Sequence, residues 1–178
     1  MSNSLKYHHY FPYKSYRSGQ EKYIDLIERS TRLKKNFLLS APNGTGKTPM
    51  VLSAAIPVVL ERGLKMIYMC RTHAQSARTI EELKKIYKLT AANSNRISGL
   101  SIRGRNEMCL NRRLLDLKAS PTEAMAICRN IRSNNNCPYY KNVRQFSNGF
   151  KNLDLFQFNK PLEAEELIEL CKESQIQI

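Results

Sequence analysis

A run of small and hydroxyl-bearing residues in the first third of the chain has the composition of a phosphate-binding loop. It matches the phosphate loop pattern except that Ala41 occupies the first glycine position. Lys47 would reach the β and γ phosphates of a nucleotide and Thr48 would bind Mg²⁺, so these two residues are the catalytic candidates. The predicted nucleotide-binding loop consists of Ala41, Pro42, Asn43, Gly44, Thr45, Gly46, Lys47 and Thr48.

Cysteine is the second residue type that could carry chemistry. The sequence shows no secretion signal, so structural disulfides are not expected, and buried thiols or metal ligands remain. No two cysteines form a C-x-x-C pair, which weakens a zinc ribbon or a bacterial ferredoxin-type cluster. On spacing alone, buried thiols and metal ligands stay equally open for Cys70, Cys109, Cys128, Cys137 and Cys171.

The elements around the loop follow an alternating order of strands and helices. An apolar run precedes the loop and a long apolar segment follows it, as in a strand–loop–helix unit of a parallel α/β sheet. Buried strands are predicted over residues 36–40, 65–70 and 97–102, and helices over residues 19–33, 49–62, 74–87 and 162–174. After Arg105 the strand pattern stops, which predicts two domains, residues 1–105 and 106–178.

The positive charge is concentrated in the first of these two parts. The chain has a formal net charge of +14, and Lys plus Arg outnumber Asp plus Glu by 19 to 6 over residues 1–105. Such a domain favours polyanionic partners, nucleic acid first, although a merely soluble basic surface would look the same. No long apolar run or apolar signal segment occurs, so a cytoplasmic protein without a membrane partner is expected.

The order of five short motifs resembles the XPD/Rad3-type superfamily 2 DNA helicases, including archaeal XPD-like proteins. The motifs are Phe11-Pro-Tyr13, Arg17-x-Gly-Gln20, the phosphate loop, Arg71-Thr-His-Ala-Gln75 and an Arg-rich turn that ends in Cys109-Leu-Asn111. The resemblance covers essentially the whole chain and corresponds to the N-terminal portion of that family. It implies a partial RecA-like parallel sheet of the P-loop type with a small, cysteine-rich, mainly helical iron–sulfur insertion.

The resemblance also assigns roles to individual residues. Gln20 and the aromatic residues that precede it would contact the adenine region of ATP. Cys109, Cys128 and Cys137 would be the first three ligands of a [4Fe-4S] cluster. The family places the fourth cysteine where this chain has Gln177, so Cys171, which lies earlier on the last predicted helix, is the candidate for that role. The implied DNA-binding residues are Arg71, Thr72, His73, Gln75 and Arg105.

Without the resemblance, His73 could equally be a histidine that caps a helix or packs in the core and does not contact DNA.

The implied activity is ATP-dependent, 5′-to-3′ unwinding of DNA in repair, with ATP, Mg²⁺ and a [4Fe-4S] cluster as cofactors. The expected partners are single-stranded or forked DNA, a separate C-terminal motor half, and repair proteins. No Asp-Glu-Ala-His motif follows Lys47, so this chain alone is not expected to hydrolyse ATP, and it resembles a truncated product, a fragment or half of a split protein. The alternatives are a non-catalytic nucleotide- and single-stranded-DNA-binding remnant or subunit, and an unrelated P-loop kinase or transferase, which the cysteines and the Arg71–Gln75 turn disfavour.

Overall fold

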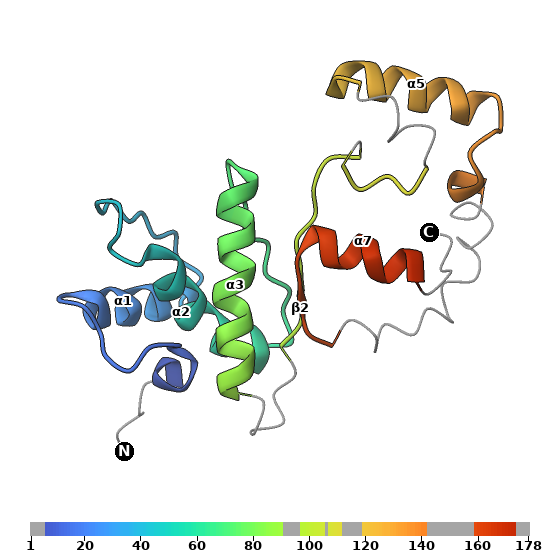
Figure 1. The fold of residues 1–178 in the computed structure, drawn as a ribbon. Coiled ribbons are helices and arrows are strands. Elements are labelled where there is room, and N and C mark those ends of the chain that lie inside the picture. Colours follow the sequence, from blue (N-terminus) through green and yellow to red (C-terminus); the bar gives the residue numbers. More distant parts are fainter. Residues whose placement is uncertain (1–5, 91–96, 106, 112–118, 142–158, 174–178) are drawn as a thin grey trace. The chain divides into compact units, whose positions relative to one another are not determined.

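The computed structural model describes residues 6–90, 97–105, 107–111, 119–141 and 159–173, and it divides into two compact units (Figure 1). The units span Met1–Ser98 and Gly99–Ile178. The division falls at Ser98, close to the boundary expected near Arg105, and the functional labels of the two parts stay predictions. None of the described helices is long and apolar enough to cross a bilayer.

Three α-helices and a short 3-10 helix build the first unit. The 3-10 helix η1 spans Lys6–Tyr10, and the helices are α1 (Gln20–Arg32), α2 (Lys47–Glu61) and α3 (His73–Thr90). The three predicted α-helices are therefore confirmed within a few residues at their ends. Both α1 and η1 pack on α2, which is apolar on most of its surface.

Two groups of buried side chains hold the first unit together. One group joins η1, α1 and α2 through Tyr7, Phe11, Ile24, Ile27, Met50 and Ala54. The other joins η1, α2 and α3 through Tyr10, Leu52, Ile56, Ile86 and Ile97. The core thus fixes the start of α2, where the phosphate loop ends, against the N-terminal segment.

The strands predicted over residues 36–40 and 65–70 were wrong for the described structure. Both segments lack strand hydrogen bonding, and Leu38, Ile67 and Met69 are 96%, 87% and 90% exposed. A strand exists only where a neighbouring strand accepts and donates its backbone hydrogen bonds, and no described residues supply such a neighbour to these segments. The predicted RecA-like sheet is therefore not formed by the part of the chain that the structure describes.

The second unit contains a small parallel sheet and two helices. Strand β1 (Gly99–Leu100) pairs in parallel with β2 (Pro161–Leu162), so the strand predicted over 97–102 is confirmed in its centre. Helix α7 (Ala164–Glu173) confirms the last predicted helix, whereas α5 (Pro121–Ser133) was not predicted. The described chain is thus a mixed, mostly helical structure with one two-stranded parallel sheet.

An ion-pair cluster fastens the end of β1 to the start of α7. Arg103 Nη2 lies 2.9 Å from Glu165 Oε2 and 3.4 Å from Glu163 Oε2, and the arginine side chain is largely covered. Ser101 N–H also donates to Leu162 O at 3.0 Å, which extends the contact between the two strand segments.

Candidate functional site

The phosphate loop is shaped by two glycines in left-handed conformation. Gly44 has φ +83° and Gly46 has φ +80°, values that favour glycine because they crowd a Cβ atom. α2 begins at Lys47, directly after the second glycine, so the unpaired N–H groups of its first turn are at the loop. This is the arrangement that binds phosphate at the N-terminus of a helix.

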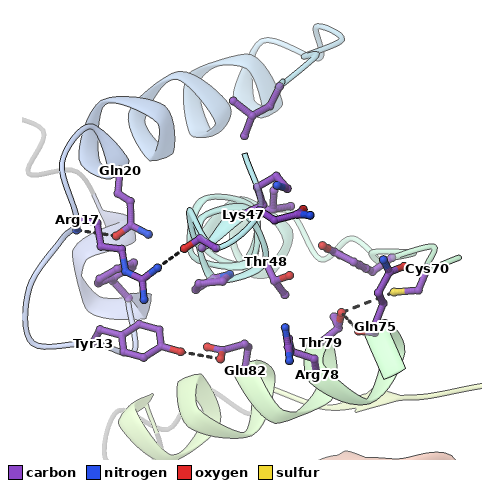
Figure 2. Close-up of a pocket in the computed structure, with 18 of the residues that line it drawn as sticks. Tyr13, Arg17, Gln20, Lys47, Thr48, Cys70, Gln75, Arg78, Thr79 and Glu82 are labelled. Atoms are coloured by element: carbon purple, nitrogen blue, oxygen red, sulfur yellow. Dashed lines mark hydrogen bonds between the residues drawn. The ribbon is translucent and has the colours of Figure 1, made fainter. Parts of the chain in front are cut away.

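The N-terminal segment closes over the loop through two polar side chains (Figure 2). Gln20 is buried, accepts from Arg17 N–H at 2.8 Å, and donates its Nε2 to Thr45 O at 2.8 Å. Arg17 Nη1 donates to Gly44 O. These two contacts join residues 25 and 27 positions apart in sequence, and both act on backbone carbonyls of the loop.

Lys47 lies within the loop. Its Nζ donates to Ala41 O and Pro42 O, each at 2.8 Å, and Thr45 Oγ1 also donates to Pro42 O, at 2.9 Å. The ammonium group is thus held by loop carbonyls at the mouth of α2. To bind a phosphate oxygen it has only to exchange these carbonyls for the ligand.

A cavity of about 1160 Å³ lies beside the loop, with room for a nucleotide. Of the predicted nucleotide-binding residues, Ala41, Pro42 and Thr45 do not line it and contribute backbone carbonyls to the loop contacts instead. The predicted residues that line the cavity are Gln20, Asn43, Gly44, Gly46, Lys47 and Thr48.

Several further lining residues were not predicted as site residues, among them Arg17, Arg78 and Glu82, and Tyr13, one of the aromatic residues expected near the adenine, lines the cavity too. Glu82 is 7% exposed, and its Oε1 accepts from Tyr13 OH at 2.6 Å and from Lys85 Nζ at 2.8 Å. The hydrogen bond with Glu82, and then that with Tyr13, raises the pKa of Lys85.

The spacing of Gln75, Thr79 and Glu82 on α3 could have indicated this wall of the cavity. Residues at i, i+4 and i+7 share one helix face, and all three line the cavity. The contact from Tyr13 to Glu82 joins residues far apart in sequence, so no local pattern pointed to it.

The predicted DNA-binding residues Arg71, Thr72, His73 and Gln75 lie together at the start of α3. Thr72 caps this helix, since its Oγ1 accepts from Gln75 N–H at 3.3 Å, and all four residues are exposed. Gln75 Oε1 accepts from Arg71 N–H at 3.1 Å. An exposed helix N-terminus with a cation beside it is suited to a phosphate backbone.

The fifth predicted DNA-binding residue, Arg105, is exposed and belongs to the second unit, where it lines a different cavity.

That second cavity, of about 430 Å³, brings together the four cysteines predicted as ligands, Cys109, Cys128, Cys137 and Cys171. Burial raises the pKa of Cys109, the neighbouring thiols Cys128 and Cys137 raise it further, and the Asn111 N–H and Arg105 act in the opposite sense. Burial also raises the pKa of Cys171, which lies on α7. As the side chains are placed, no three of the described His, Cys, Asp or Glu residues converge on a single metal-ion position.

Two further positions that bear on the cluster prediction are Cys70 and Gln177. Cys70 belongs to the first unit, where its Sγ lies 3.7 Å from Thr79 Oγ1, and the other four cysteines belong to the second unit. Gln177 lies outside the described residues.

Comparison with known proteins assigns a family through the part of the chain that contains the cysteine-lined cavity. The DEAD_2 family model matches residues 68–177, which is more than half of the chain. The chain belongs to the DEAD_2 family. The matched residues of this DEAD_2 protein include α3 and all four cysteines of the second cavity, and the phosphate loop precedes them.

A curated relative of this DEAD_2 chain carries a helicase name. It is the general transcription and DNA repair factor IIH helicase subunit XPD of Arabidopsis thaliana, 30% identical over 112 residues, or 60% of this chain. The resemblance to XPD/Rad3-type helicases is thereby confirmed. The chain spans 15% of the length of that relative, and no solved structure matches it.

Proposed function

We propose that this chain supplies the ATP-binding loop and the iron–sulfur unit of an ATP-dependent, 5′-to-3′ DNA helicase of the XPD/Rad3 type that acts in DNA repair. The observation that carries the proposal is that one chain combines a glycine-shaped loop at a helix N-terminus with four cysteines around one cavity. Its family membership and the helicase name of its relative support the same function.

The proposed nucleotide site uses the cavity beside α2. The phosphates of Mg·ATP would bind the N–H groups of the first turn of α2, with Lys47 on the β and γ phosphates and Thr48 on the metal ion. Gln20, held between Arg17 N–H and Thr45 O, fixes the backbone of the loop and would face the adenine region.

The four thiols of the second cavity fit a [4Fe-4S] cluster. Thiolates are the ligands that such clusters take from proteins, and apolar side chains such as Leu167 and Ile168 form part of the cavity wall. Cys109, Cys128, Cys137 and Cys171 would hold the cluster, which would link the segments around Cys109 and Cys137 to α5 and α7. In this proposal the cluster unit helps to separate the DNA strands.

The proposed DNA path begins at the N-terminal turn of α3. Arg71, Thr72, His73 and Gln75 present exposed cationic and polar groups there, and the excess of basic residues in the first 105 residues supports a polyanionic partner. Arg105 would contact DNA from the cluster unit. Other repair proteins and a C-terminal motor half are the further proposed partners, and the proposed location is the cytoplasm.

The proposed fold is a RecA-like P-loop motor domain over residues 1–105 and an iron–sulfur domain over residues 106–178. The exposed apolar side chains of residues 36–40 and 64–69 support it, because such rows are normally buried in a sheet. Additional strands that the described residues do not supply would cover them.

A second candidate function is a nucleotide- and single-stranded-DNA-binding subunit; the 178 residues given contain no Asp-Glu-Ala-His motif, so by themselves they are proposed to bind ATP without turning it over. That motif would position Mg²⁺ and the attacking water, and without it the positioning that drives phosphoryl transfer is lost.

The proposal is tested by binding of a fluorescent ATP analogue and of a labelled DNA single strand to the full chain. Lys47→Ala should weaken nucleotide binding at least tenfold and leave DNA binding unchanged. Arg71→Ala should weaken DNA binding and leave nucleotide binding unchanged. Lys65→Ala, which removes an exposed lysine that does not line the cavity, is the matched control. Equal nucleotide affinity in the wild type and Lys47→Ala would refute the proposed site.

A further inference from the structure

Two residues that are not predicted cluster ligands place polar N–H groups near the cysteine sulfurs of the second cavity. The first is Asn111, which is 8% exposed. Its backbone N–H donates to Cys109 Sγ at 3.4 Å, and its side-chain Nδ2 donates to Cys137 Sγ at 4.0 Å. One buried residue thus bridges two of the four sulfurs.

The second side chain is Arg132 on α5, one helical turn after Cys128. Its guanidinium carbon lies 3.9 Å from the centroid of the Tyr140 ring, and interactions with Tyr140 first, then with Cys128, raise the pKa of the arginine. Its Nε is buried and has no hydrogen-bond partner among the described residues. The stacked ring fixes the plane of the guanidinium, so a permanent cation is held at the wall of the cavity.

Neutral thiols need neither the N–H donors of Asn111 nor the positive charge of Arg132 beside them. A buried thiol packs well among apolar groups, whereas the half-buried Arg132 has a covered Nε without a partner in the described part of the chain, and a covered guanidinium nitrogen favours an anionic partner. Among the described residues that line this cavity none is acidic, so Arg132 has no carboxylate there to pair with. The negative charge that fits is that of thiolates bound to iron.

We propose that Asn111 and Arg132 are positioning residues that stabilise the negative charge of a cysteine-bound iron–sulfur cluster and set its reduction potential. The inference rests on the proposed function, since it requires that the cluster forms. Hydrogen bonds to the sulfurs and nearby charge are among the factors that set the potential of such clusters. Because reduction adds negative charge, donors and a cation favour the reduced cluster, and their removal lowers the potential.

The test is a redox titration of the anaerobically purified chain, followed by the electron paramagnetic resonance signal of the reduced cluster. Arg132→Gln, which keeps the length and removes the charge, should lower the equilibrium constant for reduction about tenfold, equivalent to about 59 mV for a one-electron couple. Asn111→Ala should shift it in the same direction. Arg129→Gln, an exposed residue on the same helix, removes the same charge and should leave the potential unchanged.

The outcomes separate the inference from the proposed function. Wild-type chain without iron and sulfide would refute the cluster and the inference with it. Wild-type chain with a cluster whose potential is the same in Arg132→Gln and Asn111→Ala would overturn the inference alone, as would an equal shift in Arg129→Gln. If Arg132→Gln cannot hold the cluster, Arg132→Lys decides: retention near the wild-type potential supports the role of the charge, and loss in Arg132→Lys overturns it.

Discussion

Alanine at Gly46 should damage the nucleotide site more than alanine at Gly44, although both glycines have almost the same backbone conformation. Their φ angles are +80° and +83°, so the strain from a Cβ atom is common to both and costs about 1–2 kcal/mol. The surroundings differ. A Cβ at Gly46 would lie 2.4 Å from Gln20 Nε2, whereas a Cβ at Gly44 would meet nothing within 4 Å.

The additional cost at Gly46 comes from the hydrogen bonds of Gln20. Its side chain can move away from the new methyl group, but it then gives up its bonds to Thr45 O and Arg17 N–H. Two hydrogen bonds of about 0.5–1.5 kcal/mol each amount to about 1–3 kcal/mol. Gly46→Ala should therefore bind nucleotide roughly 5- to 150-fold more weakly than Gly44→Ala.

The assay is equilibrium binding of a fluorescent ATP analogue to the two single variants and to Gly46→Ala combined with Gln20→Ala. In the double variant the clash has already been removed, so the effects of the two changes should not add. Equal affinities of Gly44→Ala and Gly46→Ala, or full additivity with Gln20→Ala, would show that Gln20 does not hold the loop.

Two further predictions concern stability. Arg32→Ala should destabilise the chain by about 3–5 kcal/mol in urea denaturation, because the buried carboxylate of Glu28, 2.7 Å from Arg32 Nη2, loses its cation. Arg29→Ala removes an exposed ion pair and should cost under about 1 kcal/mol. Similar losses in the two variants would contradict this account. Burial, followed by the charges of Glu21 and other nearby groups, raises the pKa of Tyr7 from 10.0 to about 12, so the phenol stays neutral in the folded state at a pH where it ionises in the unfolded state. This contribution to stability should be fully present below about pH 10 and be lost between about pH 10 and about pH 12. Tyr7→Phe should reduce the loss in denaturation measured across this range.

The helices were predictable because their signal is local. In α1, the apolar positions Ile24 and Ile27 recur at helical spacing and are buried as expected. α5 lacks so clear an apolar stripe, but Ser120 and Glu123 form a capping box that the sequence already contained. Strands 36–40 and 65–70 could not be predicted reliably, because a strand's burial depends on neighbours elsewhere in the chain.

The two candidate sites also differ in how much of each could be predicted from the sequence. The loop from Ala41 to Thr48 is one contiguous pattern, so its residues and the helix after it were found together. The contact of Tyr13 with Glu82 depends on how separate segments pack, and so does the stacking of Arg132 of α5 on the ring of Tyr140. Residue types predicted the chemistry of each site, and folding decided which additional side chains surround it.

Iron and sulfide content of the anaerobically purified chain tests the central claim most directly. The account predicts about four irons and four sulfides per chain. It also predicts lower content in each of Cys109→Ser, Cys128→Ser, Cys137→Ser and Cys171→Ser, and full content in Cys70→Ser, whose sulfur lies in the other unit. Iron-free protein, or a loss in Cys70→Ser equal to that in the other four variants, would contradict it.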